Sequence, residues 1–170
     1  DSCELTIDTN TVNRKLKLSH NNRKVTLGMN KDESYPDHPE RFDYRPQLMC
    51  RTGLTCRCYW EVEWREDVDV SVSYRGIRRK GGSDDCWFGM NDQSWSLRCS
   101  DEGYSVCHNK KKSPTGRVAV YVDFLAGSLS FYRVSSDTLI HLHTFNTTFT
   151  EPLYPGFGLM LYSGSSVSLC

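Results

Sequence analysis

The residue pair with the clearest chemical potential is Glu61 and Glu63, in the stretch CYWEVEW that covers residues 58–64. Two residues apart on a strand, their side chains point to the same side and lie about 7 Å apart. That spacing overlaps the separation of the two carboxyl groups in an inverting glycosidase. Glutamates on the solvent side of a half-buried strand explain the same pattern without any chemistry, and this second interpretation is the one we favour.

Cysteine and histidine pairs raise the question of a metal site. The chain has CxC at 56–58, CH at 107–108 and HxH at 141–143, with another cysteine at position 50. A structural zinc site requires paired spacings such as CxxC together with a second pair, which these motifs lack. The sequence also has no nucleophile elbow and no glycine-rich phosphate loop that opens a helix. We therefore expect no metal, no cofactor and no catalytic residue, so the protein is not expected to be an enzyme.

Charge and hydropathy exclude further classes of function. The chain has 21 basic and 21 acidic residues, so it lacks the overall positive field of a nucleic-acid-binding protein. The basic runs at Lys110–Lys112 and in 75–80 have few aromatic neighbours and are expected to be solvated loops. Apolar runs are too short for a membrane helix, so this domain is not expected to insert into a membrane. Because the chain begins at Asp1, we expect it to be an excerpt of a larger multidomain protein.

The eight cysteines could form disulfides or remain thiols. Cys58, Cys86 and Cys107 lie in strand-like runs, where a free cysteine behaves as a small buried apolar residue. A chain of 170 residues also has enough core to fold without a disulfide framework. We expect mostly reduced thiols and a cytoplasmic location. One sequon, Asn146-Thr147-Thr148, would permit glycosylation in the alternative case of a secreted protein.

Alternating apolar and polar residues predict an all-β fold. About thirteen short strands follow one another at spacings of roughly 8–12 residues, which is typical of a sandwich or barrel. The predicted core includes Trp60, Val62, Trp64, Phe131 and Phe157. The strand-like runs are at 3–7, 15–18, 24–27, 47–50, 58–64, 68–74, 86–90, 94–99, 103–108, 117–123, 128–133, 140–145, 152–161 and 167–169.

A proline-containing segment at 30–46 interrupts this pattern. Three prolines exclude a central strand and predict an ordered, irregular loop. Its aromatic residues Tyr35, Phe42 and Tyr44 either fix the loop to the sandwich or contact a partner, and the sequence leaves both interpretations open.

Five motifs, in order, carry a resemblance to a known family. They are LTID at 5–8, YPDHPERF at 35–42, YWEVE at 59–63, VDF…GSLSFY at 122–132 and FTEPLYPGF at 149–157. Together they resemble the PRY and SPRY segments of a PRY-SPRY domain. Two positions depart from the family pattern: Thr9 stands where a proline is expected, and Leu125 where an acidic residue is expected.

The resemblance implies a two-sheet antiparallel β-sandwich of the concanavalin-like jelly-roll type. Residues 1–52 would form the PRY segment and 53–170 the SPRY segment of one compact domain. The family implies a non-catalytic module that binds a protein partner through loops at one end of the sandwich. The sequences of these motifs resemble those of fish versions of the domain. Such domains occur at the C-termini of tripartite-motif ubiquitin ligases and of NACHT-containing NOD-like receptors of innate immunity. The motifs also resemble those in the C-terminal domains of stonefish-type pore-forming toxins, which gives a secreted alternative with a role in assembly or cell-surface binding.

Residue type and family position together nominate a binding surface. Tyrosine and arginine are frequent in binding hot spots, and loops on a rigid scaffold are common recognition sites. The meeting of these segments on one surface is implied by the family fold. The nominated partner-binding residues are Tyr35, Asp37, His38, Arg78, Arg98, Asp101 and Tyr104.

Overall fold

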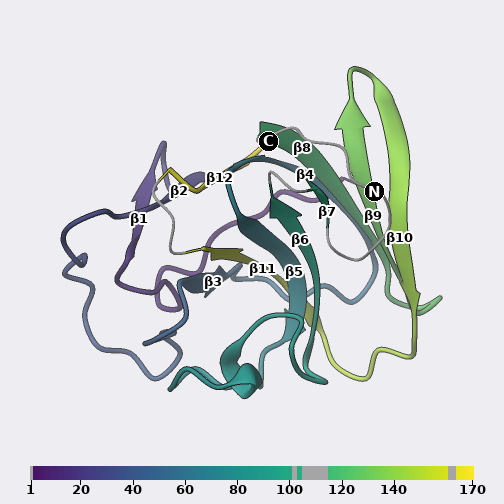
Figure 1. Ribbon diagram of the computed structural model, residues 1–170. Helices are drawn as coiled ribbons and strands as arrows, with labels where there is room; N and C mark the ends of the chain where they lie inside the picture. Colours follow the sequence, from purple (N-terminus) through teal and green to yellow (C-terminus); the bar gives the residue numbers. More distant parts are fainter. Residues whose placement is uncertain (1, 101–102, 105–114, 161–163) are drawn as a thin grey trace.

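The protein, in a computed structural model, is a sandwich of two antiparallel β-sheets, as predicted (Figure 1). The structure describes residues 2–100, 103–104, 115–160 and 164–170. The seven-stranded sheet has the order β1 (Leu16–Ser19), β2 (Lys24–Leu27), β12 (Ser166–Leu169), β4 (Arg57–Arg65), β8 (Thr115–Asp123), β9 (Ser128–Ser135) and β10 (Thr138–Asn146). The five-stranded sheet has the order β3 (Gln47–Met49), β11 (Leu153–Leu159), β5 (Val68–Tyr74), β6 (Ser94–Ser100) and β7 (Gly103–Tyr104). Within the described ranges no helix has the length and apolarity needed to cross a membrane.

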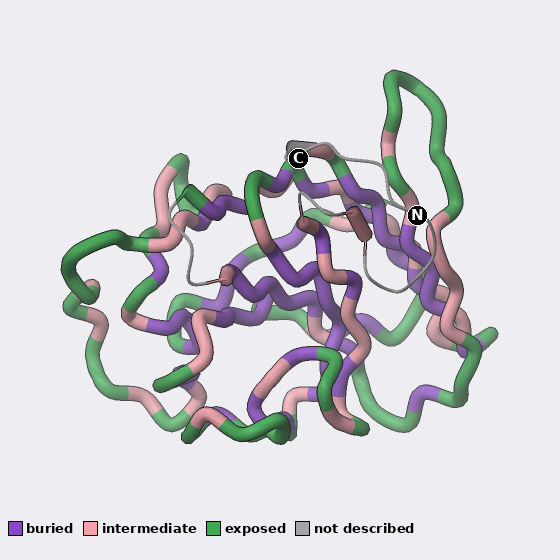
Figure 2. The backbone as a smooth tube through the Cα atoms, viewed as in Figure 1, coloured by how far each residue is buried: buried purple, intermediate pink, exposed green. Residues whose placement is uncertain are grey.

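The main core lies between the two sheets, where Figure 2 shows buried strands running through the centre of the molecule. On β4, Trp60, Val62 and Trp64 are buried, and Glu63 between them is exposed, because successive side chains point to opposite faces. All five residues of the predicted core are buried: Trp60, Val62, Trp64, Phe131 and Phe157.

Two hairpins join consecutive strands, β1 to β2 and β8 to β9, and their turns explain the residue types found there. β1 pairs with β2 from Leu16↔Leu27 to Ser19↔Lys24. The turn between them places His20, Asn21 and Asn22 at φ of 54°, 55° and 60°, a left-handed conformation that asparagine tolerates well. Between β8 and β9, Gly127 has a φ of 71°, and a Cβ there would lie 1.8 Å from the Thr147 carbonyl oxygen. Only glycine fits at that position.

Two predicted strands are absent from the described part of the chain. Residues 3–7 contribute only one isolated bridge, Ile7 to Cys50, and a second bridge pairs the preceding Ser2 with Tyr59. The run at 86–90 was predicted from apolar residues, yet the chain forms the short 3-10 helix η1 (Asp84–Cys86) followed by turns. The backbone N–H groups of Cys86 and Trp87 bond to the carbonyls of Ser83 and Asp84, so they are not available to a sheet. Residues 105–108 of the predicted 103–108 strand lie outside the described residues.

A disulfide between Cys3 and Cys58 corrects the expectation that Cys58 is a free thiol. The N-terminal segment runs beside β4, where the Cys3 N–H donates to the Tyr59 carbonyl at 2.9 Å. This placement brings the two Cα atoms to 5.5 Å, within the normal range for a disulfide. Cysteines 50, 56, 86, 99 and 170 are free, which agrees with the expectation of mostly reduced thiols, and Cys107 lies outside the described residues.

The burial of β4 predicts a large difference between inward and outward truncations. Trp60 is 4% exposed, so Trp60→Ala should lower the free energy of unfolding by about 3–5 kcal/mol. Leu125→Ala, at a side chain that is 88% exposed, should change it by less than about 0.5 kcal/mol. Chemical denaturation measures both values, and equal midpoints for Trp60→Ala and wild type would contradict the placement of β4.

Candidate functional site

Two long loops cover the outer face of the five-stranded sheet. The first is the segment 28–46, and the second is the segment 75–93 that contains η1. They close over a second, smaller apolar cluster of Phe42, Met49, Ile77 and Phe88. Phe42 and Phe88 contact edge to face with their ring centroids 5.6 Å apart. Because each loop contributes buried side chains to this cluster, the two loops form one ordered layer on the sheet.

Two cations of the second loop, buried Arg79 and exposed Lys80, bind the two loops together through backbone carbonyls. Arg79, 9% exposed, donates to the carbonyls of Glu40 at 2.8 Å and Arg75 at 2.7 Å. Lys80 donates to the carbonyls of His38 and Arg41 at 3.0 and 2.8 Å. These bonds satisfy the carbonyl groups that an irregular loop cannot pair in a sheet.

Arg41, from the first loop, has the same role and is 2% exposed. Its guanidinium donates to the carbonyls of Pro36, Thr9 and Val12 at 2.7–3.0 Å. Burial lowers the pKa of Arg41 from its ordinary value, as it does the pKa of Arg79, because the charged form loses solvation.

The centre of the candidate site is the indole of Trp87, immediately after η1. The guanidinium carbons of Arg45 and Arg98 lie 4.2 Å and 5.0 Å from the ring centroid. The indole N–H donates to Asp69 Oδ2 at 3.3 Å. Trp87 is therefore fixed by two cation–π contacts and one hydrogen bond while part of it remains accessible to solvent.

Asp69 on β5 anchors this arrangement from below. Its side chain is 2% exposed, and Arg98, directly opposite on β6, donates to its two oxygens at 3.0 and 3.3 Å. Burial raises the pKa of Asp69, whereas the bonds from Arg98 and Trp87 oppose that rise. In turn, the bond to Asp69 raises the pKa of Arg98. The result is a two-pronged ion pair beneath an aromatic ring.

A pocket of about 280 Å³ adjoins Trp87. Tyr44 at its rim is 64% exposed, an unusual exposure for a large aromatic side chain. Next to it, Arg45 donates to the Gly82 carbonyl at 2.5 Å, while its Nε is buried with no hydrogen-bond partner among the described residues. The lining is Lys15, Tyr44, Arg45, Pro46, Gln47, Asp69, Trp87, Gly158, Leu159 and Met160. This combination of aromatic, aliphatic and cationic groups suits a peptide or protein surface rather than a substrate undergoing chemistry.

The structure places the nominated first-loop residues away from Trp87. Tyr35 is half-buried, and its hydroxyl donates to the Leu16 carbonyl at 2.8 Å. Asp37 is exposed and pairs with Arg14 at 2.6 Å, and that hydrogen bond lowers the pKa of Asp37. His38 accepts a hydrogen bond from the Glu40 backbone N–H at 3.1 Å. None of the three lines the Trp87 pocket.

The other nominated residues divide between opposite faces. Arg98 lies in the site, and Arg78 is exposed on the second loop with a 3.5 Å contact to Asp85. Tyr104 is opposite Cys99 on β7 and packs on the main core, 5.8 Å from Trp64. Burial raises the pKa of Tyr104 to about 12. Asp101 lies outside the described residues.

Sequence reasoning missed Asp69, Arg45 and Trp87. Asp69 occupies a polar position in an alternating strand, a pattern that ordinarily indicates a solvent-facing residue. Trp87 was assigned to a strand, although Ser83-Asp84-Asp85 before it is a helix-start signal. Tyr44 and Phe42 had been considered together, and the structure separates them: Phe42 fixes the loop at 0% exposure, whereas Tyr44 is exposed.

Family models match nearly the whole chain. The model for the SPRY-associated domain, PRY, matches residues 5–54, and the model for the SPRY domain matches residues 57–170. Among curated proteins, the chain is 44% identical to stonustoxin subunit beta of Synanceia horrida, over 91% of this chain and 23% of the toxin subunit. It is 35% identical to tripartite motif-containing protein 16 of Mus musculus, over 93% of this chain and 30% of that protein.

Solved structures give the same result. The stonustoxin structure superposes with a TM-score of 0.89 at 39% identity, covering 99% of this chain and 29% of the toxin chain. The crystal structure of the TRIM65 PSpry domain superposes with a TM-score of 0.83 at 27% identity, covering 99% of this chain and 91% of that one. The chain spans about a quarter of the length of the toxin subunits that it matches.

Removal of the Arg98 side chain should lower the free energy of unfolding, because the buried Asp69 carboxylate loses its partner. A fully buried charge left without its partner costs about 3–5 kcal/mol, and because the Arg98 side chain is 35% exposed we expect about 2–3 kcal/mol for Arg98→Ala. Arg78→Ala, in an exposed pair, should stay within about 0.5 kcal/mol of wild type in the same denaturation experiment.

A double variant tests the origin of this cost. Asp69→Asn combined with Arg98→Ala should recover part of the lost stability, since no charge then remains buried alone. A double variant less stable than the sum of the two single changes would contradict the ion-pair explanation.

Proposed function

The chain belongs to the PRY-SPRY family, and from that premise we propose that it is a non-catalytic recognition module that binds a protein partner at the surface around Trp87. The observation that carries the proposal is the contact of a partly accessible indole with two guanidinium groups, next to an exposed tyrosine and a pocket. Tryptophan, tyrosine and arginine are the residue types that dominate binding hot spots.

Rigidity of the site supports this proposal. A side chain that is already fixed in the free protein loses little conformational entropy on binding. Trp87 is held by Asp69, and the loop that carries Tyr44 and Arg45 is tied through backbone carbonyls to the loop that carries Trp87. The mixture of charge and aromatic surface fits a polar interface of moderate size.

The parent protein is part of the proposal. We place the domain at the sensing or substrate-recruiting end of a cytoplasmic innate-immune receptor or ubiquitin ligase. The similarity to mouse tripartite motif-containing proteins 16 and 14, at 35% and 34% identity, supports this placement.

A secreted parent is the second candidate, in which the domain serves the assembly or cell-surface binding of a pore-forming toxin of the stonefish type. Two observations favour it. Several toxin subunits are 41–44% identical to the chain. The chain also contains the Cys3–Cys58 disulfide, and such bonds persist in oxidising compartments.

Binding is tested with a variant that leaves the fold intact. Proteins captured by wild type should be bound at least about tenfold more weakly by Tyr44→Ala, because a hot-spot side chain contributes more than about 1.4 kcal/mol. Leu125→Ala is the matched control, since it also truncates an exposed apolar side chain, outside the Trp87 pocket. Quantitative affinity measurement on each captured protein decides, and equal binding by both variants would place the interface elsewhere.

The number of free thiols distinguishes a cytoplasmic parent protein from a secreted one. A protein isolated from an oxidising compartment should give at least two fewer thiols in denaturant without reductant than the eight it gives after reduction, because Cys3 and Cys58 are bonded to each other, the one such pair among the described cysteines. Eight thiols without reductant would favour the cytoplasmic parent.

In the folded protein, the cysteines should be alkylated in an order set by their burial. Burial raises the pKa of Cys50 to about 12 and that of Cys99 well above its ordinary value, so both should resist alkylation at pH 8. Exposed Cys56 should react first. Peptide mass spectrometry after brief alkylation gives this order, and early labelling of Cys50 would contradict the described burial.

A further inference from the structure

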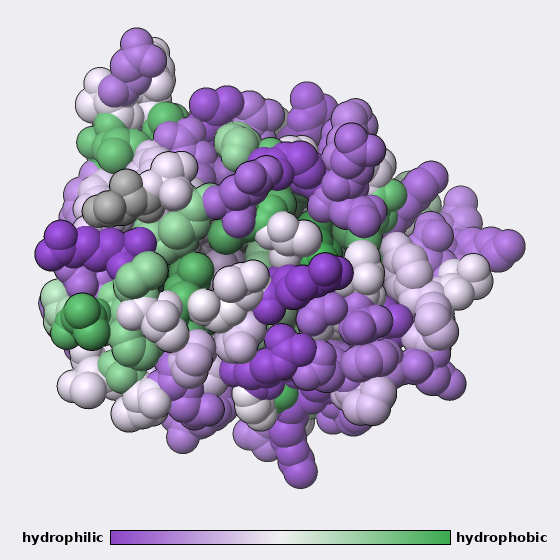
Figure 3. Space-filling model, turned by 180° about the vertical axis from the view of Figure 1, so that it is seen from behind, coloured by the Kyte–Doolittle hydropathy of each residue, from purple (hydrophilic) through white to green (hydrophobic). Residues whose placement is uncertain are grey.

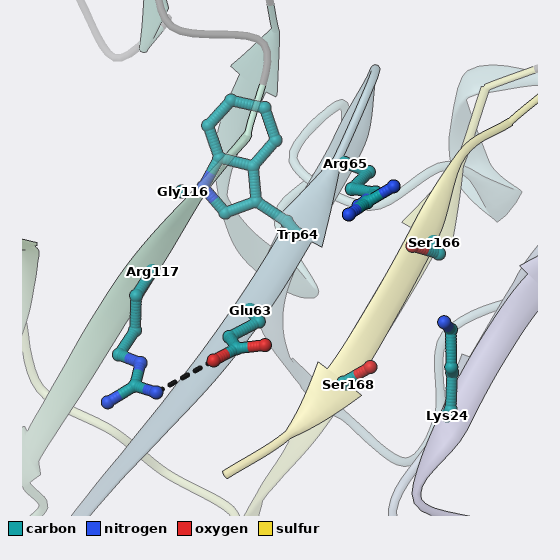
Figure 4. Close-up of a pocket in the computed structure, with 8 residues that line it drawn as sticks. All are labelled: Lys24, Glu63, Trp64, Arg65, Gly116, Arg117, Ser166 and Ser168. Atoms are coloured by element: carbon teal, nitrogen blue, oxygen red, sulfur yellow. Dashed lines mark hydrogen bonds and ion pairs between the residues drawn. The ribbon is translucent and has the colours of Figure 1, made fainter.

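A second pocket lies on the outer face of the seven-stranded sheet. The loop that contains Trp87 covers the other, five-stranded sheet. The volume of the pocket is about 420 Å³, and it extends over β2, β12, β4 and β8 (Figure 4). The lining residues are Lys24, Glu63, Trp64, Arg65, Gly116, Arg117, Ser166 and Ser168. Three of the eight are cationic and one is acidic, although the whole chain has no net charge.

Strand register explains why these side chains converge. Ser168 on β12 lies between Lys24 on β2 and Glu63 on β4. In the next outward-facing row, Ser166 is directly opposite Arg65. Directly opposed residues of antiparallel strands have Cβ atoms about 4.5–5.5 Å apart, so two serine hydroxyls and two cations share one small area.

The hydrogen-bond donors in this area are uncommitted. No hydrogen bond or ion pair joins the Lys24 ammonium, the Arg65 guanidinium or the hydroxyls of Ser166 and Ser168 to another described residue. The residue Ser166 is only 6% exposed, but its hydroxyl is not among the fully buried, unpartnered polar atoms of the described residues, so this oxygen is open to the pocket. The pocket therefore presents two cations and two hydroxyls that no other described residue engages.

The acidic residue of the pocket, Glu63, is by contrast already paired with an arginine. Glu63 accepts a hydrogen bond from Arg117 at 2.7 Å, shown by the dashed line in Figure 4, and Arg117 also contacts Glu61 at 3.4 Å. Figure 4 shows this pair on the β4–β8 side, away from Lys24 and Ser168. The unpaired positive charge is thus concentrated over β12, between Lys24 and Arg65.

We propose that this pocket is a binding site for a phosphate group. Lysine and arginine form strong charge-assisted hydrogen bonds with phosphate oxygens, and an arginine can present two parallel donors. A phosphate above β12 would accept from Lys24, Arg65 and the two serines. The group can belong to a free phosphate or phosphomonoester, or to the headgroup of a phospholipid.

The test is titration of the whole chain with inorganic phosphate at constant ionic strength, so that screening of charge stays the same. Amide chemical shifts should change saturably around Lys24, Arg65, Ser166 and Ser168. Lys24→Ala/Arg65→Ala should weaken binding at least about tenfold, because each lost charge-assisted bond is worth more than about 1.4 kcal/mol. Lys31→Ala/Arg51→Ala removes the same charge from exposed positions outside the pocket and should bind as wild type does.

Two further comparisons complete the experiment. Glu63→Gln should tighten binding, since it removes the negative charge nearest the phosphate. Glycerol 3-phosphate in solution and phosphatidic acid in phosphatidylcholine vesicles then distinguish the sources: binding of the first supports a free phosphomonoester, and binding of vesicles alone supports a lipid headgroup. Absence of saturable binding to every probe, or an equal loss in the Lys31→Ala/Arg51→Ala control, would overturn the proposal.

Discussion

Burial of β5 on both of its faces is the constraint on which the candidate site around Trp87 depends. Val68, Val70 and Val72 pack into the main core, and the alternate residues Asp69 and Ser71 are buried on the opposite face. The face of an antiparallel sheet that does not contact the partner sheet is commonly left in water. On β5 that face is buried, so another part of the chain must cover it. In this chain the cover is made from two irregular loops, and their order is a condition for the stability of the strand.

Covering a sheet with irregular loops creates a problem of backbone polarity, which the chain solves with cations. Carbonyl groups in a buried loop have no partner strand and lose free energy unless another donor reaches them. Arg41 and Arg79 each supply several donors from one buried side chain. The same arginines would read as a solvated basic patch from sequence alone. Their positive charge is an internal structural element, whereas Tyr44 on the first loop is exposed and Trp87 on the second is partly exposed.

Sequence periodicity was sufficient for strands that have one polar face and insufficient where that rule fails. β4 alternates between buried and exposed residues, so its period and its core residues could be predicted. β5 alternates in the same way, but its polar residues are buried, and only the three-dimensional cover distinguishes them from surface residues. Tyr104 illustrates a related limit. It lies six positions after Arg98, yet β7 pairs it with Cys99, and it packs on the main core. The disulfide was equally hidden, because 55 residues separate its cysteines and an isolated bridge beside β4 brings them together.

Charge balance over a whole chain therefore says little about the charge of one surface. Acidic side chains here are concentrated where arginines need partners: Asp69 binds Arg98, Glu40 binds Arg75, and Glu63 binds Arg117. Figure 3, which views the face opposite that of Figure 1, shows a largely hydrophilic surface, with hydrophobic residues gathered on the side of the β9–β10 hairpin. An acidic side chain in an ion pair contributes little to the electrostatic potential at a ligand site, because the pair is nearly neutral at a distance. Lys24 and Arg65 keep their full charge for this reason, and a molecule with equal numbers of acids and bases can present a local site for an anion.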